Sequence, residues 1–196
     1  CSTAVGYLNP IKKRPNLKII INAHVKKINF ENKVAKSGLI NIDLADYYPK
    51  GERILFDIKP LLWQEFVLKE KDFRQFIKKN DWSVYQDKFV AVYNTADAIV
   101  PSWAYMLIVS ALEPFAKKVV YGNLEALETV IFIDSLKQNL SPSEYTNKMV
   151  IIKGCGDLPI TNAAYLEAVN ILKPYVKNLM FGEACSSVPV YKAPKK

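Results

Sequence analysis

The residues with the clearest chemical potential lie in two short polar segments near the end of the chain. Cys155 and Asp157 belong to a Gly-Cys-Gly-Asp run that follows an apolar segment. Glu183 and Cys185 belong to a Gly-Glu-Ala-Cys run that follows another. Cysteine thiolates bind soft metal ions and carry out thiol chemistry. We therefore expect a metal or thiol site where the two segments meet.

A regular alternation of strand and helix patterns predicts the elements that would bring these residues together. Short apolar segments typical of strands occupy residues 89–93, 119–122, 149–153 and 179–181, and helical patterns occupy residues 103–115 and 161–176. Repeated strand–helix–strand spacing is typical of right-handed crossovers and parallel sheets. We predict an α/β fold with a mostly parallel sheet between helix layers, a Rossmann-like three-layer arrangement. No repeat of fixed period is visible, so residues 35–196 are predicted to form a single domain.

This fold predicts where a ligand would bind. In an open parallel sheet, ligands bind beyond the carboxyl ends of the strands. Glycines at these ends allow close backbone approach, and neighbouring helix N-termini offer free N–H groups to anions. The polar residues that follow the four predicted strands form the candidate rim: Asn94, Thr95, Asp97, Asn123, Cys155, Asp157, Glu183 and Cys185.

Three functions remain open for this rim. Cys155 and Cys185 with nearby carboxylates would suit iron or zinc, or a thiol reaction. If the cysteines are instead core residues, Asn94, Thr95 and Asn123 beside helix N-termini would suit a small anionic metabolite. A partner-binding protein without catalysis is the third alternative. The motifs that would identify an enzyme, such as a phosphate loop or a hydrolase elbow, are missing from the sequence, so no catalytic residue is predicted.

The composition excludes some classes of protein. Residues 1–36 hold eight Lys or Arg against one Glu, so the remaining residues carry only +1 of the net charge of +8. A nucleic-acid-binding domain would show a basic face on its folded body, so we predict no nucleic-acid partner. Three cysteines are too few for a disulfide scaffold, and the longest apolar run is too short to cross a bilayer. We expect a cytoplasmic protein without a membrane partner.

The basic N-terminal segment, residues 1–34, is predicted to form a β-hairpin-like extension rather than an independent domain. It resembles an internal fragment of the glucose–methanol–choline flavoprotein oxidoreductases. The residues that carry this resemblance are 1–4, 7–8 and 14–17, with Ala23, Val25, Ile28 and Phe30. The flavin fingerprint and catalytic histidines of that family have no counterpart in the sequence. We expect no flavin and no oxidoreductase activity.

The rest of the chain resembles a bacterial family catalogued as domain of unknown function 2480. The motifs that carry this resemblance include Lys-Gly-Cys-Gly-Asp-Leu-Pro at residues 153–159, and the others are residues 32–40, 46–49, 96–106, 122–128 and 182–192. The family has no established reaction. Its members are often encoded beside iron–sulfur cluster assembly proteins, so the resemblance implies an accessory role in that assembly and those proteins as partners. The sequence leaves open whether residues 1–34 are a fusion, a truncation product or an error.

Overall fold

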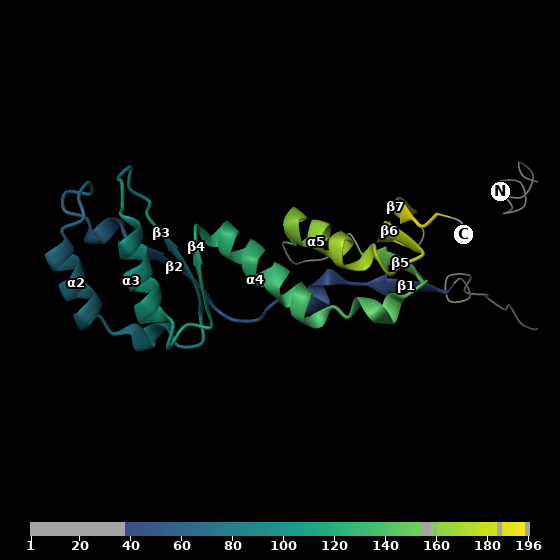
Figure 1. Cartoon of the computed structure of the whole chain (residues 1–196), viewed down its shortest axis with the longest axis horizontal. Coiled ribbons are helices and arrows are strands. Elements are labelled where there is room, and N and C mark those ends of the chain that lie inside the picture. The colour runs from purple at the N-terminus through teal and green to yellow at the C-terminus, as the bar shows by residue number, and fades with distance from the viewer. Residues whose placement is uncertain (1–37, 154–157, 159, 184–185, 195–196) are drawn as a thin grey trace, which may run out of the picture. The chain divides into compact units, whose positions relative to one another are not determined.

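The computed structural model describes residues 38–153, 158, 160–183 and 186–194 (Figure 1). Its strands are β1 (Leu39–Ile42), β2 (Arg53–Asp57), β3 (Phe89–Tyr93), β4 (Lys118–Tyr121), β5 (Met149–Ile152), β6 (Asn178–Glu183) and β7 (Ser186–Lys192). Its α-helices are α2 (Glu70–Lys79), α3 (Ser102–Leu112), α4 (Leu124–Asn139) and α5 (Asn162–Leu172). Short 3-10 helices occupy Leu44–Tyr47 (η3), Lys59–Leu61 (η4), Trp82–Tyr85 (η5) and Pro142–Tyr145 (η6). The predicted α/β class is confirmed.

The first sheet has the order β2-β3-β4, with all strands parallel and helices on both faces. Alternate side chains of a strand point to opposite faces, so Val90 and Val92 pack on one side of β3 and Phe89 and Ala91 on the other. The first pair joins α2 and α3 in an apolar cluster that includes Phe73, Ala104, Ile108 and Leu112. The second pair packs against α4. All four β3 residues are buried because both faces of the sheet are covered.

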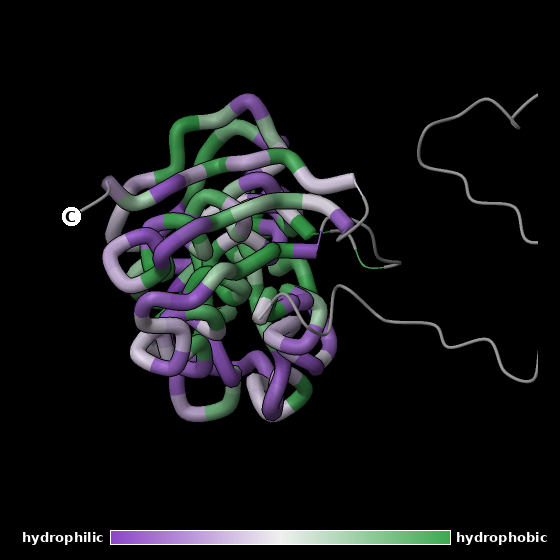
Figure 2. Tube along the Cα trace, turned by 90° about the vertical axis from the view of Figure 1, so that its right-hand side faces the viewer, coloured by the Kyte–Doolittle hydropathy of each residue, from purple (hydrophilic) through white to green (hydrophobic). Residues whose placement is uncertain are grey.

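The second sheet has the order β1-β5-β6-β7. The first three strands are parallel, and β7 runs antiparallel to β6. One face packs against α5 and α4. That cluster contains Ile42, Leu44, Phe132, Leu136, Leu140, Val150, Ile152, Ala164, Ala168, Leu172, Val176 and Leu179. These apolar residues form the core of the second sheet. Many apolar stretches of the chain run through the middle of the trace in Figure 2, and many polar stretches lie at its periphery.

Helix α4 contributes to the cores of both sheets. Leu127 and Ile131, near its start, pack on the first sheet, whereas Phe132 and Leu136 pack on the second. Such a helix must be apolar on more than one side, which a single amphipathic stripe would not provide. Asn123, a residue type that favours helix N-termini, caps it by accepting a hydrogen bond from the Ala126 N–H at 2.9 Å. One helix therefore joins the two sheets.

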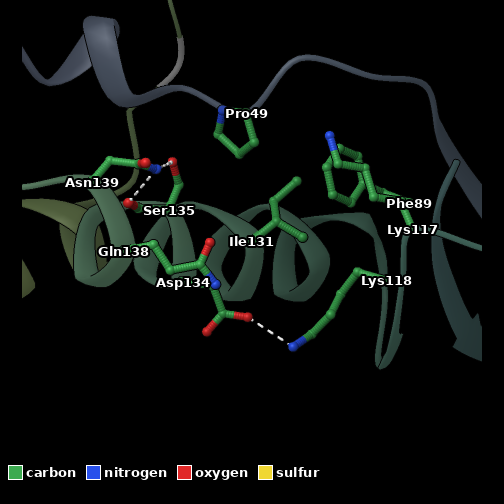
Figure 3. A pocket seen from close by; sticks show the side chains of 9 residues that line it. All are labelled: Pro49, Phe89, Lys117, Lys118, Ile131, Asp134, Ser135, Gln138 and Asn139. Atoms are coloured by element: carbon green, nitrogen blue, oxygen red, sulfur yellow. Dashed lines mark hydrogen bonds and ion pairs between the residues drawn. The ribbon is translucent and has the colours of Figure 1, made fainter. Parts of the chain in front are cut away.

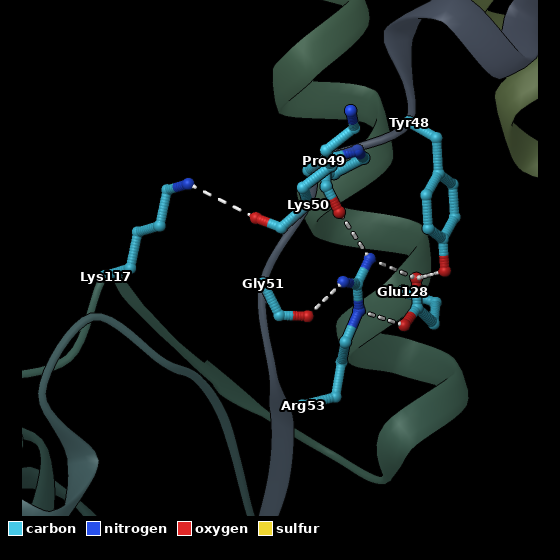
Figure 4. Close-up of polar contacts among 7 residues, drawn as sticks. All are labelled: Tyr48, Pro49, Lys50, Gly51, Arg53, Lys117 and Glu128. Carbon is cyan, nitrogen blue, oxygen red and sulfur yellow. Dashed lines mark hydrogen bonds and ion pairs between the residues drawn. The ribbon is translucent and has the colours of Figure 1, made fainter.

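The segment that connects β1 to β2 is bound to α4 by Arg53 and Glu128 (Figure 4). Arg53 Nε donates to Glu128 Oε1 at 2.6 Å, and its Nη2 donates to Oε2 at 3.3 Å. Arg53 also donates to the carbonyl oxygens of Gly51 and Pro49, and the Tyr48 hydroxyl donates to Glu128 at 2.9 Å. The side chains of Arg53 and Glu128 are 16% and 24% exposed. Partial burial and paired hydrogen bonds distinguish this ion pair from an exposed one.

The two sheets are built from an internal repeat, so the prediction of no fixed period is wrong. A shift of sixty positions aligns residues 80–122 with 140–182 without a gap. Under that shift η5, β3, α3 and β4 fall on η6, β5, α5 and β6. Identical residues recur at twelve positions: Ser83, Tyr85, Lys88, Val90, Asp97, Ala104, Tyr105, Val109, Leu112, Pro114, Lys117 and Gly122.

Backbone geometry supports the same equivalence. Asp87 and Asn147 both take a left-handed conformation, with φ of 58° and 60°. Their N–H groups donate to the carbonyl oxygens of Phe115 and Tyr175, each at 2.9 Å. Strands β2 and β1 also correspond, because they pair with β3 and β5 in the same parallel register. The first repeat is therefore β2-α2-β3-α3-β4, and it lies in the chain between β1 and α4 of the second repeat, β1-α4-β5-α5-β6.

The prediction of one sheet between helix layers is also wrong. It assumed that β3, β4, β5 and β6 would follow one another in a single sheet. Instead, α4 leads from β4 of the first sheet to β5 of the second, and β5 pairs with β1 and β6. The chain thus forms two small, mostly parallel sheets. The predicted N-terminal extension, residues 1–34, lies outside the described residues.

We predict that Glu128→Gln lowers the free energy of unfolding by about 1–3 kcal/mol, because a half-buried Arg53 would lose its charged partner. The measurement is urea denaturation followed by circular dichroism. Asp134→Asn is the matched control, because Asp134 also lies on α4 and pairs with Lys118, but both side chains are more exposed. That control should lose less than about 1 kcal/mol. Equal losses in the two variants would contradict the structural role of Arg53 and Glu128.

Candidate functional site

The eight predicted rim residues do not share one rim. Asn94, Thr95 and Asp97 follow β3, and Asn123 follows β4, so these four belong to the first sheet. Glu183 ends β6 in the second sheet. The remaining three, Cys155, Asp157 and Cys185, lie outside the described residues. The single rim was predicted because all four strands were assigned to one sheet, whereas each repeat builds its own.

The polar residues at the first rim hold the loops that follow the strands. Thr95 donates through its N–H and hydroxyl to the Asp57 carboxylate, at 3.1 and 2.6 Å. Asn94 bonds three backbone groups of its own loop, at Ala96 and Ala98. Burial raises the pKa of Asp57, but hydrogen bonds from Thr95 and Lys59 outweigh it and leave the pKa below its ordinary value. These groups are already occupied, which weakens their assignment as ligand-binding residues.

The second rim brings together Asp43, Lys153 and Glu183. They stand at the carboxyl ends of β1, β5 and β6, which are consecutive strands of one sheet. Lys153 Nζ lies 2.8 Å from Asp43 Oδ2, and the Ala45 N–H donates to Asp43 Oδ1 at 3.0 Å. The hydrogen bond from Lys153 holds the pKa of Asp43 below its ordinary value. The same bond, with a smaller contribution from Glu183, raises the pKa of Lys153.

Comparison of the repeats shows how the second rim differs from the first. Asp43 is equivalent to Asp57, and each accepts a hydrogen bond from the backbone N–H two residues later. Thr95, the partner of Asp57, is equivalent to Cys155. Asn94 and Ala96 become Gly154 and Gly156, so the second repeat lacks the side chain that ties the loop in the first. The second repeat thus replaces loop-stabilising groups with a thiol between two glycines.

Asp43 and Lys153 were not among the predicted site residues. Asp43 follows β1 by one residue, and Lys153, which the sequence pattern includes in the strand over residues 149–153, follows β5 by one residue. A charged residue directly after a buried apolar run was the available signal. Thr161 was also missed. Its hydroxyl precedes α5, is inaccessible to solvent and, within the residues that the structure describes, has no hydrogen-bond partner.

A polar cavity of about 360 Å³ lies elsewhere, between α4 and the amino ends of β3 and β4 (Figure 3). It is lined by Pro49, Phe89, Lys117, Lys118, Ile131, Asp134, Ser135, Gln138 and Asn139. Lys118 and Asp134 form an ion pair at 2.8 Å. Parallel sheets bind ligands at the opposite ends of their strands, so this cavity is a weaker candidate than the second rim.

Within residues 38–153 and the described parts of the C-terminal region, there is no group of three or more His, Cys, Asp or Glu side chains that would hold a metal ion. None of the described helices is long and apolar enough to cross a membrane. The second rim, where Asp43, Lys153 and Glu183 stand at the carboxyl ends of three adjacent parallel strands, is the candidate functional site.

We predict that Lys153→Met raises the pKa of Asp43 toward 3.8, its ordinary value. Because the folded-state pKa is depressed, the pair stabilises the fold above that ordinary value and loses its effect as pH falls through the folded-state pKa. The stability difference between wild type and variant should therefore shrink on acidification. Carboxyl NMR titration measures the pKa, and Asp57, bound by Thr95, is the internal control that should not move. An unchanged Asp43 pKa would contradict the pairing.

Comparison with known proteins identifies the family of the chain. No curated protein and no solved structure matches it. A family model described as "Protein of unknown function (DUF2480)" matches residues 28–193, which include both repeats and both rims. The resemblance of residues 1–31 to flavoprotein oxidoreductases stays a prediction. The chain belongs to the DUF2480 family.

Proposed function

We propose that this protein handles a soft metal ion, iron or zinc, or a thiol-bound group at the second rim, as an accessory of iron–sulfur cluster assembly. Cys155 and Cys185 are the proposed ligands or reactive thiols, with Asp157 and Glu183 as polar partners. The support comes from strand pairing. β5 and β6 are adjacent and parallel, with Ile152 opposite Phe181, and the two cysteines follow the ends of these strands by three and two residues.

The difference between the repeats carries the proposal. The loop after β3 is closed by hydrogen bonds from Asn94 and Thr95. The equivalent loop after β5 has glycine and cysteine at those positions. Glycine has no side chain that could hold the loop, but it allows a ligand to approach the backbone closely. These residue types suit a ligand-binding loop better than a loop closed by its own side chains.

Lys153 would adjust the chemistry of such a site. It lies two residues before Cys155, and an adjacent cation favours the thiolate, which is the form that binds metals and attacks electrophiles. Asp43 holds the ammonium group at the rim by the 2.8 Å ion pair. Thiolates select soft ions such as zinc and iron over magnesium or calcium. This chemistry favours a soft metal over a hard one.

The proposal predicts that the full chain, purified without oxygen, binds added Fe²⁺ or Zn²⁺ in a stoichiometric amount. Cys155→Ser and Cys185→Ser should each lose most of the metal, because each removes one soft ligand. Cys1→Ser is the matched control and should bind as wild type does. Metal content after gel filtration is the measurement. Equal binding by all three variants would rule out the cysteine rim.

A small anion is the second candidate for the same rim. Lys153 supplies a cation there, and the Thr161 hydroxyl before α5 finds no partner among the described residues. Helix N-termini favour anions. In this case inorganic phosphate should shift the amide resonances of α5, Lys153→Met should abolish the shifts, and Cys155→Ser should leave them intact. Phosphate shifts that need Lys153, in a chain that binds no metal, would replace the first proposal by this one.

A further inference from the structure

The first repeat carries an exposed apolar surface along its last strand. We define the β4 patch as Tyr93, Ile99, Tyr105, Met106, Val109 and Tyr121. Ile99 is 94% exposed, Met106 70% and Tyr121 68%. The Tyr105 and Tyr93 rings contact the Tyr121 ring edge-on, at centroid distances of 5.2 and 6.3 Å. Contiguous exposed apolar groups of this kind mark interaction surfaces.

The patch adjoins an open sheet edge. In the described part of the chain, β4 pairs with β3 alone, so its outer edge offers unpaired N–H and C=O groups. Open edges are templates for pairing with another strand, and proteins usually protect them with charges or bulges. Val119, Val120 and Tyr121 give β4 no such protection, although Lys118 begins it and pairs with Asp134.

In the second repeat, strand β7 pairs along the edge of β6, which corresponds to the open edge of β4. There, β7 runs antiparallel along β6, placing Tyr191 opposite Leu179 and Val188 opposite Phe181. Val190 of β7 lines an apolar cavity of about 340 Å³ together with Tyr165, Leu166 and Phe181. Those last three residues are the equivalents of Tyr105, Met106 and Tyr121 in the β4 patch. A strand of this chain thus occupies in one repeat the sheet edge that is open in the other, while Leu166 on α5 stays 64% exposed.

We propose that a second copy of this chain covers the β4 patch, by antiparallel pairing of β4 with β4 about a twofold axis through Val120. A twofold axis makes the two edge strands antiparallel, which is the direction of β7 on β6. This register places Val119 of one copy opposite Tyr121 of the other. The pairs Val119–Tyr121 and Tyr121–Val119 match Leu179–Tyr191 and Phe181–Val188 of the second repeat in residue type, although β7 has a register shift between its two pairs that the β4–β4 pairing lacks. Strand β4 therefore has residue types suited to pairing with a second copy of itself.

The distribution of charged and apolar side chains around β4 is compatible with this dimer. The residues at the centre of the pairing, Val119 to Tyr121, are uncharged. Lys118 lies at the end of the strand, so antiparallel pairing keeps the two copies of this charge apart. Met106 and Val109 lie on α3 beside the strand, where they extend the apolar contact between copies. The inference rests on the first repeat, so it stands apart from the function proposed for the second rim.

Sedimentation velocity of the full chain in reducing buffer tests the proposal. We expect a dimer at micromolar concentrations, and Met106→Glu should convert it to a monomer because it places a charge in the contact. Leu166→Glu is the matched control: it changes the equivalent helix position of the second repeat, where Leu166 is 64% exposed, and should leave the dimer intact. Far-ultraviolet circular dichroism confirms that both variants are folded.

A second variant tests the register. Residues directly opposite each other in antiparallel strands have Cα atoms about 4.5–5.5 Å apart, within the range that a disulfide spans. Val120→Cys in a Cys1→Ser/Cys155→Ser/Cys185→Ser chain should therefore form a covalent dimer on mild oxidation, whereas Val84→Cys in the same background should not. A monomeric full chain would overturn the proposal, as would a dimer that survives Met106→Glu or is lost in Leu166→Glu. Monomeric behaviour would instead assign the patch to a segment outside the described residues or to another protein.

Discussion

The packing of α4 against both sheets is the constraint on which the rest of the structure depends. Neither sheet has enough strands to bury its apolar side chains alone, and small isolated sheets are marginally stable in water. Leu127 and Ile131 complete the core of the first sheet, and Phe132 and Leu136 contribute to that of the second. The Arg53–Glu128 pair then holds the connecting segment on the same helix. Folding of one sheet is therefore coupled to folding of the other through a single helix.

The nested repeat explains how one frame supports two different rims. Each repeat places the ends of three parallel strands side by side and follows the first of them with an aspartate, Asp57 or Asp43. In the first repeat this carboxylate is bound by Thr95, whereas in the second it is bound by Lys153. The aspartate thus binds the start of the loop after β3 in the first repeat, whereas in the second it forms an ion pair with Lys153 at the rim where we propose the metal or thiol site. This division of labour is the basis of the function that we propose.

Sequence reasoning found the elements that are dictated locally. Strand β3 was predicted with its observed bounds because its apolar run is continuous, and the Asn123 cap followed from residue type and position. Strand β7 was missed because Pro189 and two serines weaken its strand pattern. The repeat was missed because most equivalent positions conserve size rather than identity, as Val92 and Ile152 do. Asn94 and Thr95 were predicted as ligands, but polar side chains at strand ends also satisfy backbone groups.

The central claim is that the two cysteines after β5 and β6 form one soft site. X-ray absorption at the zinc edge, on the full chain loaded with zinc without oxygen, tests it most directly. The account predicts two sulfur neighbours per zinc at about 2.3 Å, with the remaining ligands oxygen or nitrogen. A zinc ion surrounded only by oxygen and nitrogen, or a chain that retains no zinc, would contradict it.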